Sequence, residues 1–198
     1  MPLTPKGAAT KQRIVEGAAT AIRRQGVFAL TLDDVLAATA TSKSQLFHYF
    51  PGGKDELMLA VARHEADRVI GDQQPELGAL TSWAAWQSWR DKVVARYREQ
   101  GRECPLDIAV SQIGSATAGA QSVAVGLLDH WQAELAAGIR HMQSIGEVDA
   151  DRDADRAAAA LLAGIQGGVV ILLSTGRLGH LEAALDQGIA DLRRRVTA

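Results

Sequence analysis

Residues 41–57, TSKSQLFHYFPGGKDEL, bring together several side chains that can bind nucleic acid. A glutamine can pair with adenine at two points in the major groove, and Gln45 lies in the middle of this stretch. Lys43 and Tyr49 supply an ammonium and a hydroxyl, which are groups that contact phosphates. A helix that filled a core would carry more apolar residues, so the segment is predicted to face a polar partner.

Two apolar residues in this segment are expected to attach it to the rest of the protein. Leu46 and Phe50 lie one helical turn apart. Ser42, with Gln45 three residues later, resembles a capping box and predicts the start of the helix. With Leu46 and Phe50 turned inward, the side chains expected to face outward are Lys43, Ser44, Gln45, Phe47 and His48.

Two further helices are predicted before this one. Apolar residues recur at four-residue spacing from Lys11 to about Gln25, which predicts a helix that ends at Gly26, preceded by a basic N-terminal arm. Thr31, followed three residues later by Asp34, predicts a second and shorter helix. Two short helices joined by a tight turn, the second one polar, describe a helix-turn-helix.

The stretch from about Lys11 to Leu57 resembles the DNA-binding domain of TetR-family transcriptional repressors. The resemblance rests on the helix that ends at Gly26, on TLDDVLAAT, and on SKSQLFHYFPGGKDEL, which is similar to the family's serine-lysine and leucine-aromatic pattern. Ala40 departs from it, because the family's turn usually has Gly there. Residues 51–54 also appear one residue longer than the commoner spacing. Ala40 is expected to cost little if the turn avoids a positive φ.

The resemblance implies an all-α fold and a ligand-responsive repressor. Residues 1–53, including the basic arm, would form a three-helix DNA-binding domain with the helix-turn-helix. Residues 54–198 would form a helical ligand-binding and dimerisation domain. The implied partners are a palindromic double-stranded DNA operator, a second copy of the chain, and a small apolar or aromatic effector that releases the DNA.

Nine residues are predicted to contact DNA, with different roles. Gln45 and Ser44 are the candidates for reading bases. His48 could serve bases or phosphates, and Phe47 could touch a thymine methyl group or fill space. For two of the phosphate candidates, Thr31 and Ser42, helix capping is an equally good interpretation. The residues predicted to hold phosphates are Thr31, Ser42, Lys43, Tyr49 and Lys54.

The C-terminal part reads as helix throughout. The Ala/Gly-rich stretch 157–174 is almost long enough to span a membrane, but its glycines and Gln166 favour a buried helix that another helix approaches closely, so no membrane contact is expected. The stretches 157–174 and 178–196 look like the pair that forms a four-helix bundle with a second copy in the family. The alternative is that both close the core of a single chain.

Aromatic residues of the middle helices raise the question of a ligand. An aromatic stripe at helical spacing is more often ordinary core than pocket. The resemblance nevertheless implies an effector cavity among these helices. Cys104 could sense oxidants, although a buried inert thiol is the simpler interpretation. The predicted ligand-binding residues are Trp86, Trp89, Ile113, Trp131 and Gln166.

Composition and charge agree with a DNA-binding end on a larger helical body. Residues 1–58 carry seven Lys/Arg and five Asp/Glu, a net charge of +2, against −4 for the remainder. A single cysteine excludes an internal disulfide and fits a reducing compartment, and the polar N-terminus lacks a signal peptide, so a cytoplasmic location is expected.

Enzymatic patterns are weak in this sequence. No His-Glu metal motif, cysteine cluster or phosphate-binding glycine loop is present, so no catalytic residues, metal or cofactor are expected. Two competing interpretations remain, and in the first of them residues 42–50 form only a solvated face. One is a helical small-molecule-binding protein or helical enzyme without DNA binding, and the other is a helical adaptor that binds a partner protein.

Overall fold

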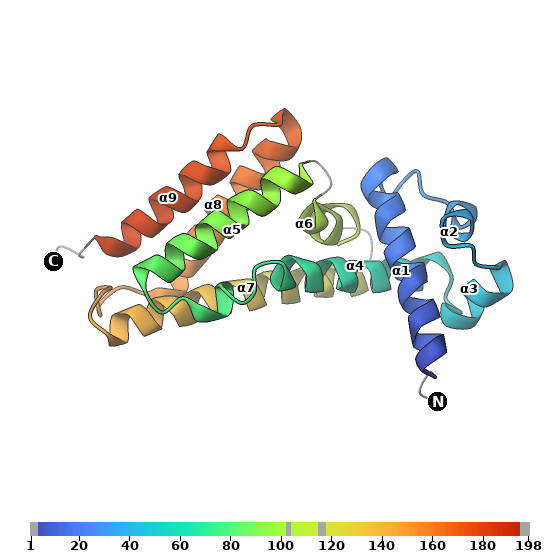
Figure 1. Ribbon diagram of the computed structural model, residues 1–198, viewed down its shortest axis with the longest axis horizontal. Coiled ribbons are helices and arrows are strands. Elements are labelled where there is room, and N and C mark those ends of the chain that lie inside the picture. The colour runs from blue at the N-terminus through green and yellow to red at the C-terminus, as the bar shows by residue number, and fades with distance from the viewer. Residues whose placement is uncertain (1–3, 102–103, 115–117, 195–198) are drawn as a thin grey trace. The chain divides into compact units, whose positions relative to one another are not determined.

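The computed structural model describes residues 4–101, 104–114 and 118–194, and every regular element among them is a helix (Figure 1). The predicted all-α fold is therefore confirmed. The elements are α1 (Pro5–Gln25), α2 (Leu32–Thr39), α3 (Lys43–Tyr49), α4 (Lys54–Gly71), η1 (Leu77–Ala79), α5 (Trp83–Gln100), α6 (Pro105–Asp107), η2 (Ile108–Gln112), α7 (Ala118–Ser144), α8 (Ala154–Thr175) and α9 (Gly179–Arg193).

These helices form two compact units. The N-terminal unit comprises the described parts of residues 1–69 and 103–126, and the C-terminal unit comprises the described parts of 70–102 and 127–198. The chain therefore returns to the N-terminal unit after α5. The predicted boundary after residue 53 separates a DNA-binding domain from a ligand-binding and dimerisation domain, and this separation of functions stays a prediction.

The first helix begins earlier than predicted. Thr4 caps it, with its side-chain oxygen accepting from the Gly7 N–H at 3.2 Å, and Pro5 occupies the first turn. Proline suits that position because the N–H it lacks would have no helical partner there. The expectation of a helix start at Lys11 after a basic arm is therefore wrong, since the cations of residues 5–13 belong to α1.

A close contact between α1 and α2 fixes the helix-turn-helix on its support. A Cβ added at Gly17 of α1 would lie 2.2 Å from Cγ2 of Thr39, so only glycine fits at this point. The Arg13 guanidinium donates a hydrogen bond to the Thr39 carbonyl. The Thr39 hydroxyl, itself buried, donates to the Val35 carbonyl at 2.7 Å. The C-terminus of α2 is thereby bound to α1 by packing and by hydrogen bonds.

The turn between α2 and α3 does adopt a positive φ. Ala40 has φ 47° and ψ 44°, which is the left-handed helical region, and its N–H bonds the Leu36 carbonyl. The expectation that the turn avoids positive φ is therefore wrong. The left-handed residue is needed because the chain must leave α2 and reach the cap of α3 within two residues.

The N-terminal unit also holds α4 against α1 through a buried ion pair. Glu65 of α4 has a fully buried side chain, and its carboxylate lies 2.5 Å from the Arg23 guanidinium of α1. Arg68 approaches the same carboxylate at 3.4 Å. A buried carboxylate is tolerated only when it is paired in this way. The pair therefore fixes the register of α4 on α1.

The core of the C-terminal unit is built on aromatic residues from α5 and α7. Trp86, Trp89 and Trp131 are each 0% exposed, and the first two meet edge to face with ring centroids 5.8 Å apart. Gly138 of α7 allows close packing here, since a Cβ there would lie 2.6 Å from Cβ of Leu80 and 3.2 Å from Cζ2 of Trp86. The aromatic stripe predicted on α5 therefore faces the core.

Helices α8 and α9 approach each other closely at two glycines (Figure 1). A Cβ at Gly168 would lie 2.5 Å from Cα of Leu181, and one at Gly188 would lie 2.4 Å from Cδ1 of Leu161. The prediction that glycines of α8 admit a neighbouring helix is therefore confirmed at Gly168. Gly167 differs, because no atom lies within 4 Å of a Cβ built there. Residues 195 and 196 of the predicted final helix lie outside the described residues.

By length and composition α8 could cross a membrane, and core helices of water-soluble proteins meet the same two criteria. Only 39% of its most apolar window is buried within this chain. The buried side carries the contacts with α9, including Gly168. The exposed side carries small and apolar residues, among them Val170, which is 59% exposed. This exposed side is an apolar surface that a single chain leaves uncovered.

The backbone of Ala40 generates a prediction about stability. Replacing Ala40 with Gly should raise the free energy of unfolding by about 0.5–1 kcal/mol, because glycine adopts the left-handed region without the steric cost that alanine has there. Denaturant unfolding at a fixed protein concentration measures the change. As a matched control, Ala37→Gly in exposed helical surface of α2 should lower it by about 1 kcal/mol. Equal effects of the two changes would contradict the assignment.

Candidate nucleic-acid interface

The third helix is attached by very few side chains. Leu46 is 1% exposed and Phe50, the residue that ends the helix, is 0% exposed, and both belong to the core cluster of the N-terminal unit. The residues of α3 that are exposed are Lys43, Ser44, Gln45, Phe47 and His48. The predicted inward and outward sides of the helix are therefore confirmed. A polar helix face is left open to solvent.

Both helices of the motif begin with a complete capping box, as their sequences predicted. The Ser42 hydroxyl accepts from the Gln45 N–H at 3.2 Å, while the Gln45 side-chain oxygen accepts from the Ser42 N–H at 3.2 Å. Thr31 and Asp34 form the same pair of bonds at the start of α2. Ser42 and Thr31 are thus helix caps, and contact with phosphate would be an additional role for each.

The capping interaction leaves the amide of Gln45 suited to base recognition. Its oxygen has two lone pairs, of which the cap uses one, and its NH₂ group remains a donor. Pairing with adenine needs one acceptor and one donor on the same amide. The cap also fixes the position of the side chain at the first turn of α3, where a recognition helix presents its base contacts.

Electrostatics support the first capping box. Hydrogen bonds from the Thr31 side chain, and then from the Thr31 backbone N–H, lower the pKa of Asp34 below its ordinary value. The carboxylate is therefore ionised at neutral pH. Because its pKa is lower in the folded state, this cap stabilises α2 above the ordinary pKa of aspartate and loses that effect as the pH falls through the folded value.

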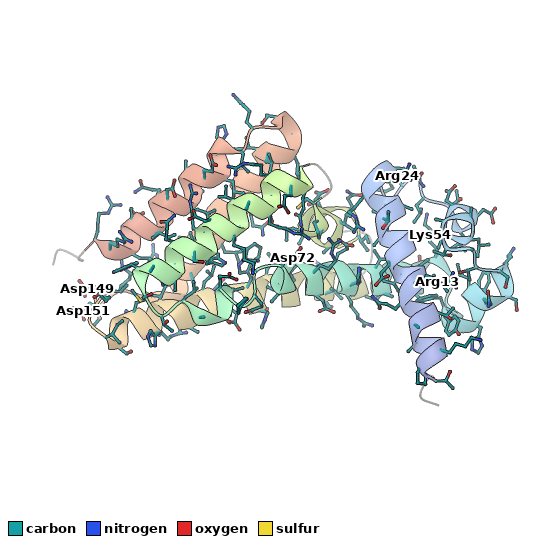
Figure 2. The ribbon with its side chains drawn as sticks, in the orientation of Figure 1. Arg13, Arg24, Lys54, Asp72, Asp149 and Asp151 are labelled. Carbon is teal, nitrogen blue, oxygen red and sulfur yellow. The ribbon has the colours of Figure 1, made fainter. Side chains whose placement is uncertain are left out.

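Lys54 has a more internal position than predicted. It is half-buried at the start of α4 (labelled in Figure 2), and its Nζ donates to the Leu30 carbonyl at 2.5 Å. This bond ties the first turn of α4 to the loop before α2. An ammonium has three N–H donors, so two remain for a phosphate.

The aromatic residues of α3 differ in exposure. Phe47 is 39% exposed and lies against Gly53, whose added Cβ would be 3.5 Å from Cε1 of that ring. Tyr49 is half-buried against the core cluster, and His48 meets its ring edge-on at 4.9 Å. Of the predicted phosphate contacts, Tyr49 is thus partly a packing residue.

Two residues that hold the motif in place were not singled out from the sequence. Arg13 binds the last carbonyl of α2, and Gly17 provides the space for Thr39 (Figure 2 labels Arg13). A glycine inside a helical pattern is a known sign of close approach, so Gly17 carried a usable signal. Arg13 had none, because one more cation on a helix surface is usually solvated.

Two short capped helices joined by a tight turn, with the polar face of the second helix exposed, define a helix-turn-helix DNA-binding protein. Residues 14–61 match the model of the family described as bacterial regulatory proteins, tetR family. Residues 14–61 therefore carry the DNA-binding domain of the tetR family, and regulators of this family bind DNA and dimerise.

Curated relatives carry the same kind of description. The transcriptional regulator AcuR of Cereibacter sphaeroides is 23% identical over 175 residues, which cover 84% of this chain and 77% of that protein. An uncharacterized HTH-type transcriptional regulator of Mycobacterium tuberculosis is 28% identical over 90 residues. The second match covers 46% of this chain and 43% of the relative.

Solved structures share the fold along nearly the whole chain. A TetR transcriptional regulator from Chloroflexus aurantiacus has a TM-score of 0.80 at 22% identity, with 98% of each chain covered. A TetR-family transcriptional regulator from Cytophaga hutchinsonii has a TM-score of 0.81 at 18% identity, also with 98% of each chain covered. At these identities the likeness concerns the fold.

The residues predicted to bind a ligand do not all belong to one unit. Trp86, Trp89, Trp131 and Gln166 lie in the C-terminal unit, on α5, α7 and α8. Ile113 lies in the N-terminal unit, where it is 1% exposed and packs in the core cluster with Leu46 and Phe50. Ile113 is therefore a core residue of the other unit, and its role towards a ligand stays a prediction.

Other candidate chemistry is limited in the described part of the chain. Cys104 is buried, as the simpler interpretation expected. No group of three or more His, Cys, Asp or Glu side chains that could hold a metal ion occurs among residues 4–101, 104–114 and 118–194. Among the described residues, the features that could bind a partner or a ligand are thus the exposed face of α3 and the tryptophan-rich interior of the C-terminal unit.

The four tryptophans differ in hydrogen bonding, and the difference predicts unequal stability effects. The Trp89 indole N–H donates to Gln73 Oε1 at 2.9 Å inside the core, whereas that of Trp86 has no partner in the part of the chain that the structure describes. Replacing Trp89 with Phe should lower the free energy of unfolding by about 1–3 kcal/mol more than Trp86→Phe, since only the former removes a buried hydrogen bond. Thermal or denaturant unfolding measures both, and a larger loss in Trp86→Phe would refute the bonding pattern.

Proposed function

We propose that the chain is a ligand-responsive repressor that binds a palindromic operator as a homodimer and leaves it when a small apolar or aromatic effector binds. The observation that carries the proposal is the open polar face of α3, held by Leu46 and Phe50. A major groove about 12 Å wide accepts such a helix. The interpretation as a small-molecule carrier or enzyme without DNA binding gives no role to this face.

On DNA, the exposed residues of α3 would divide between positioning and reading. Lys43 and the hydroxyl groups of Ser42, Thr31 and Tyr49 would contact phosphates, with Lys54 supporting the register from the start of α4. Gln45 and Ser44 would read base edges, and Gln45 would favour adenine. His48 would take either role, and Phe47 would contact a thymine methyl group.

One α3 helix buries too little surface for selective binding, so two copies are required. In a two-fold dimer the recognition helices would enter successive major grooves about 34 Å apart, which is why the operator is expected to be palindromic. We assign the dimer contact to α8 and α9. The support is the uncovered side of α8, where small and apolar residues recur at helical spacing: Ala160, Ala163, Gly167 and Val170.

Effector binding would act by linkage between two conformers. A ligand that prefers the conformer unsuited to DNA by tenfold weakens DNA binding by about 1.4 kcal/mol at most. Movement of α4 would change the separation of the two recognition helices. Trp86, Trp89, Trp131, Gln166 and Ile113 remain the proposed ligand residues. A cytoplasmic, non-enzymatic role goes with this function.

Substitutions on α3 test DNA recognition. Lys43→Ala should weaken binding to all sequences and reduce the slope of log affinity against log salt by about one unit, because one phosphate contact is lost. Gln45→Ala should lose about 1–3 kcal/mol of discrimination at one base pair in each half-site. Mobility-shift titrations on an operator selected from random duplexes, at several salt concentrations, measure both effects.

Gln45→Glu separates base reading from capping. Glutamate keeps the acceptor for the Ser42 N–H but lacks the NH₂ donor, so Gln45→Glu should also lose the base preference. Gln45→Ala alone should weaken the cap, by about 1 kcal/mol of unfolding free energy. Unchanged operator binding in Lys43→Ala and in both Gln45 variants would refute α3 as the recognition helix.

A charged residue on the uncovered side of α8 tests the dimer. Gly167→Arg is expected to give a monomer, because Gly167 has open space within its own chain and the arginine would meet the partner's α8 instead. Operator affinity should then fall by at least about tenfold, since each monomer holds one half-site. Light scattering gives the mass, and a mobility-shift titration gives the affinity.

The matched control is Ala137→Arg, at an exposed position of α7 in the same unit. It should leave both the mass and the operator affinity unchanged. Circular dichroism of the two variants shows whether each is folded. A dimeric, operator-binding Gly167→Arg protein would place the interface elsewhere.

A further inference from the structure

The interior of the C-terminal unit contains buried hydrogen-bond donors without acceptors. Trp86 and Trp131 are each 0% exposed, and neither indole N–H has a partner among the described residues. The buried amide nitrogen of Gln166 also lacks one. Buried polar groups are nearly always paired, and each exception needs an explanation such as a missing ligand.

The two indole donors lie along the same face of α7. The Trp86 ring reaches α7 from α5 and lies against Gly138, where an added Cβ would be 3.2 Å from Cζ2. Trp131 belongs to α7 itself, seven residues before Gly138. Seven residues make about two helical turns, or about 10 Å along the axis. A small molecule placed against this face could meet both indoles.

Gln166 comes to the interior from a third helix. On α8, Gly164 and Gly168 face α9, where Ala184 and Leu181 are their neighbours. Gln166 lies on the other flank of α8, on the same side as the buried Leu162 and Val169, four residues before it and three after it. Gln166 is half-buried, and its buried amide nitrogen belongs to the side of α8 away from α9.

The unpaired buried groups are all hydrogen-bond donors. Every buried side-chain polar atom that lacks a partner in the described residues is a nitrogen donor: besides the three above, only Nε of Arg152, in the connection between α7 and α8. No buried side-chain oxygen in that part of the chain is left unpaired. A molecule that satisfies this interior must therefore bring acceptors.

Charge favours a neutral acceptor over an anion. The cations of α5 within the unit are already paired, Arg90 with Asp186 at 2.7 Å, Arg96 with Asp72 at 2.7 Å and Lys92 with Glu76 at 2.5 Å. A carboxylate placed against the indoles would find no free counter-ion among these cations of α5, and an unpaired buried charge is far more costly than a neutral carbonyl that accepts hydrogen bonds.

We propose that the effector is a neutral, largely apolar carbonyl compound, a ketone or an ester, whose oxygen atoms accept hydrogen bonds from Trp86, Trp131 and Gln166. The proposal rests on the ligand response proposed above and names the chemistry of its ligand. The tryptophan rings would enclose the apolar part, and the three N–H groups would select the oxygens. Amines would be rejected, because a donor cannot satisfy a donor.

Indole NMR signals of the full-length protein test this directly. The chain has four tryptophans, so four indole N–H signals are expected, and single Trp→Phe variants assign them. Acetophenone should move the Trp86 or Trp131 signal downfield, as hydrogen bonding does. Trp89 should move little, because its N–H already donates to Gln73. Ethylbenzene, which has a CH₂ group in place of the carbonyl, should produce no downfield shift.

Variants then separate hydrogen bonding from packing. Trp86→Phe and Trp131→Phe each keep an aromatic ring but remove a donor, and the variant that lacks the indole whose signal acetophenone moves should bind acetophenone about tenfold more weakly, the equivalent of one lost hydrogen bond. Gln166→Leu should bind acetophenone less well while raising the melting temperature of the free protein by about 2–4 °C, since an unpaired buried donor is removed. The control Gln132→Leu, at a half-buried residue of α7 whose amide is not among the unpaired buried groups, should do neither.

Three results would overturn the carbonyl assignment. They are equal binding of ethylbenzene and acetophenone, tighter binding of 1-phenylethylamine or benzoate, and the absence of any indole shift up to the solubility limit of acetophenone. Operator binding by the same samples without probe is measured alongside. Loss of that binding would refute the proposed regulator, whereas intact binding with a failed probe series would refute only the chemistry of the effector.

Discussion

The exposed face of α3 depends on the burial of two side chains, Leu46 and Phe50. A helix of seven residues is far too short to be stable alone in water, so its existence and its orientation both come from tertiary contacts. Full burial of each anchor contributes about 1.5–3 kcal/mol, which is a large share of the few interactions that α3 makes with its own chain. The five exposed residues of the helix can meet a partner because Leu46 and Phe50 hold it in place.

The elements around α3 are also positioned by few residues, most of them small. Gly17 lets Thr39 pack directly on α1, and the left-handed Ala40 then turns the chain into the cap of α3. In the C-terminal unit, Gly168 brings α8 onto α9 in the same way. Small residues thus set the distances between helices, and the positions of large functional side chains follow from those distances.

The helix-turn-helix and the interior of the C-terminal unit differ in how completely their polar groups are hydrogen-bonded. At the helix-turn-helix the caps, Arg13 and Lys54 pair the backbone groups at the helix ends, which makes the motif a defined rigid surface. Inside the C-terminal unit, the indole N–H groups of Trp86 and Trp131 find no partner among the residues that the structure describes. An interior that keeps unpaired donors is less stable than an apolar one of equal packing, and such a cost is typical of a region shaped for a ligand.

The sequence by itself determined the all-helical class, the two capping boxes and the inward side of α3, because periodicity and caps are local and involve residues within one or two turns. The prediction from the sequence placed the start of α1 too late, because Thr4 and Pro5 were not recognised as the cap and the first residue of the helix. Only the tertiary structure decided that Ala40 is left-handed, that Lys54 binds Leu30, that Ile113 belongs to the N-terminal core and that Trp86 and Trp131 lack acceptors. These outcomes depend on which atoms from distant parts of the chain come within a few ångströms of each other, and no local pattern encodes that.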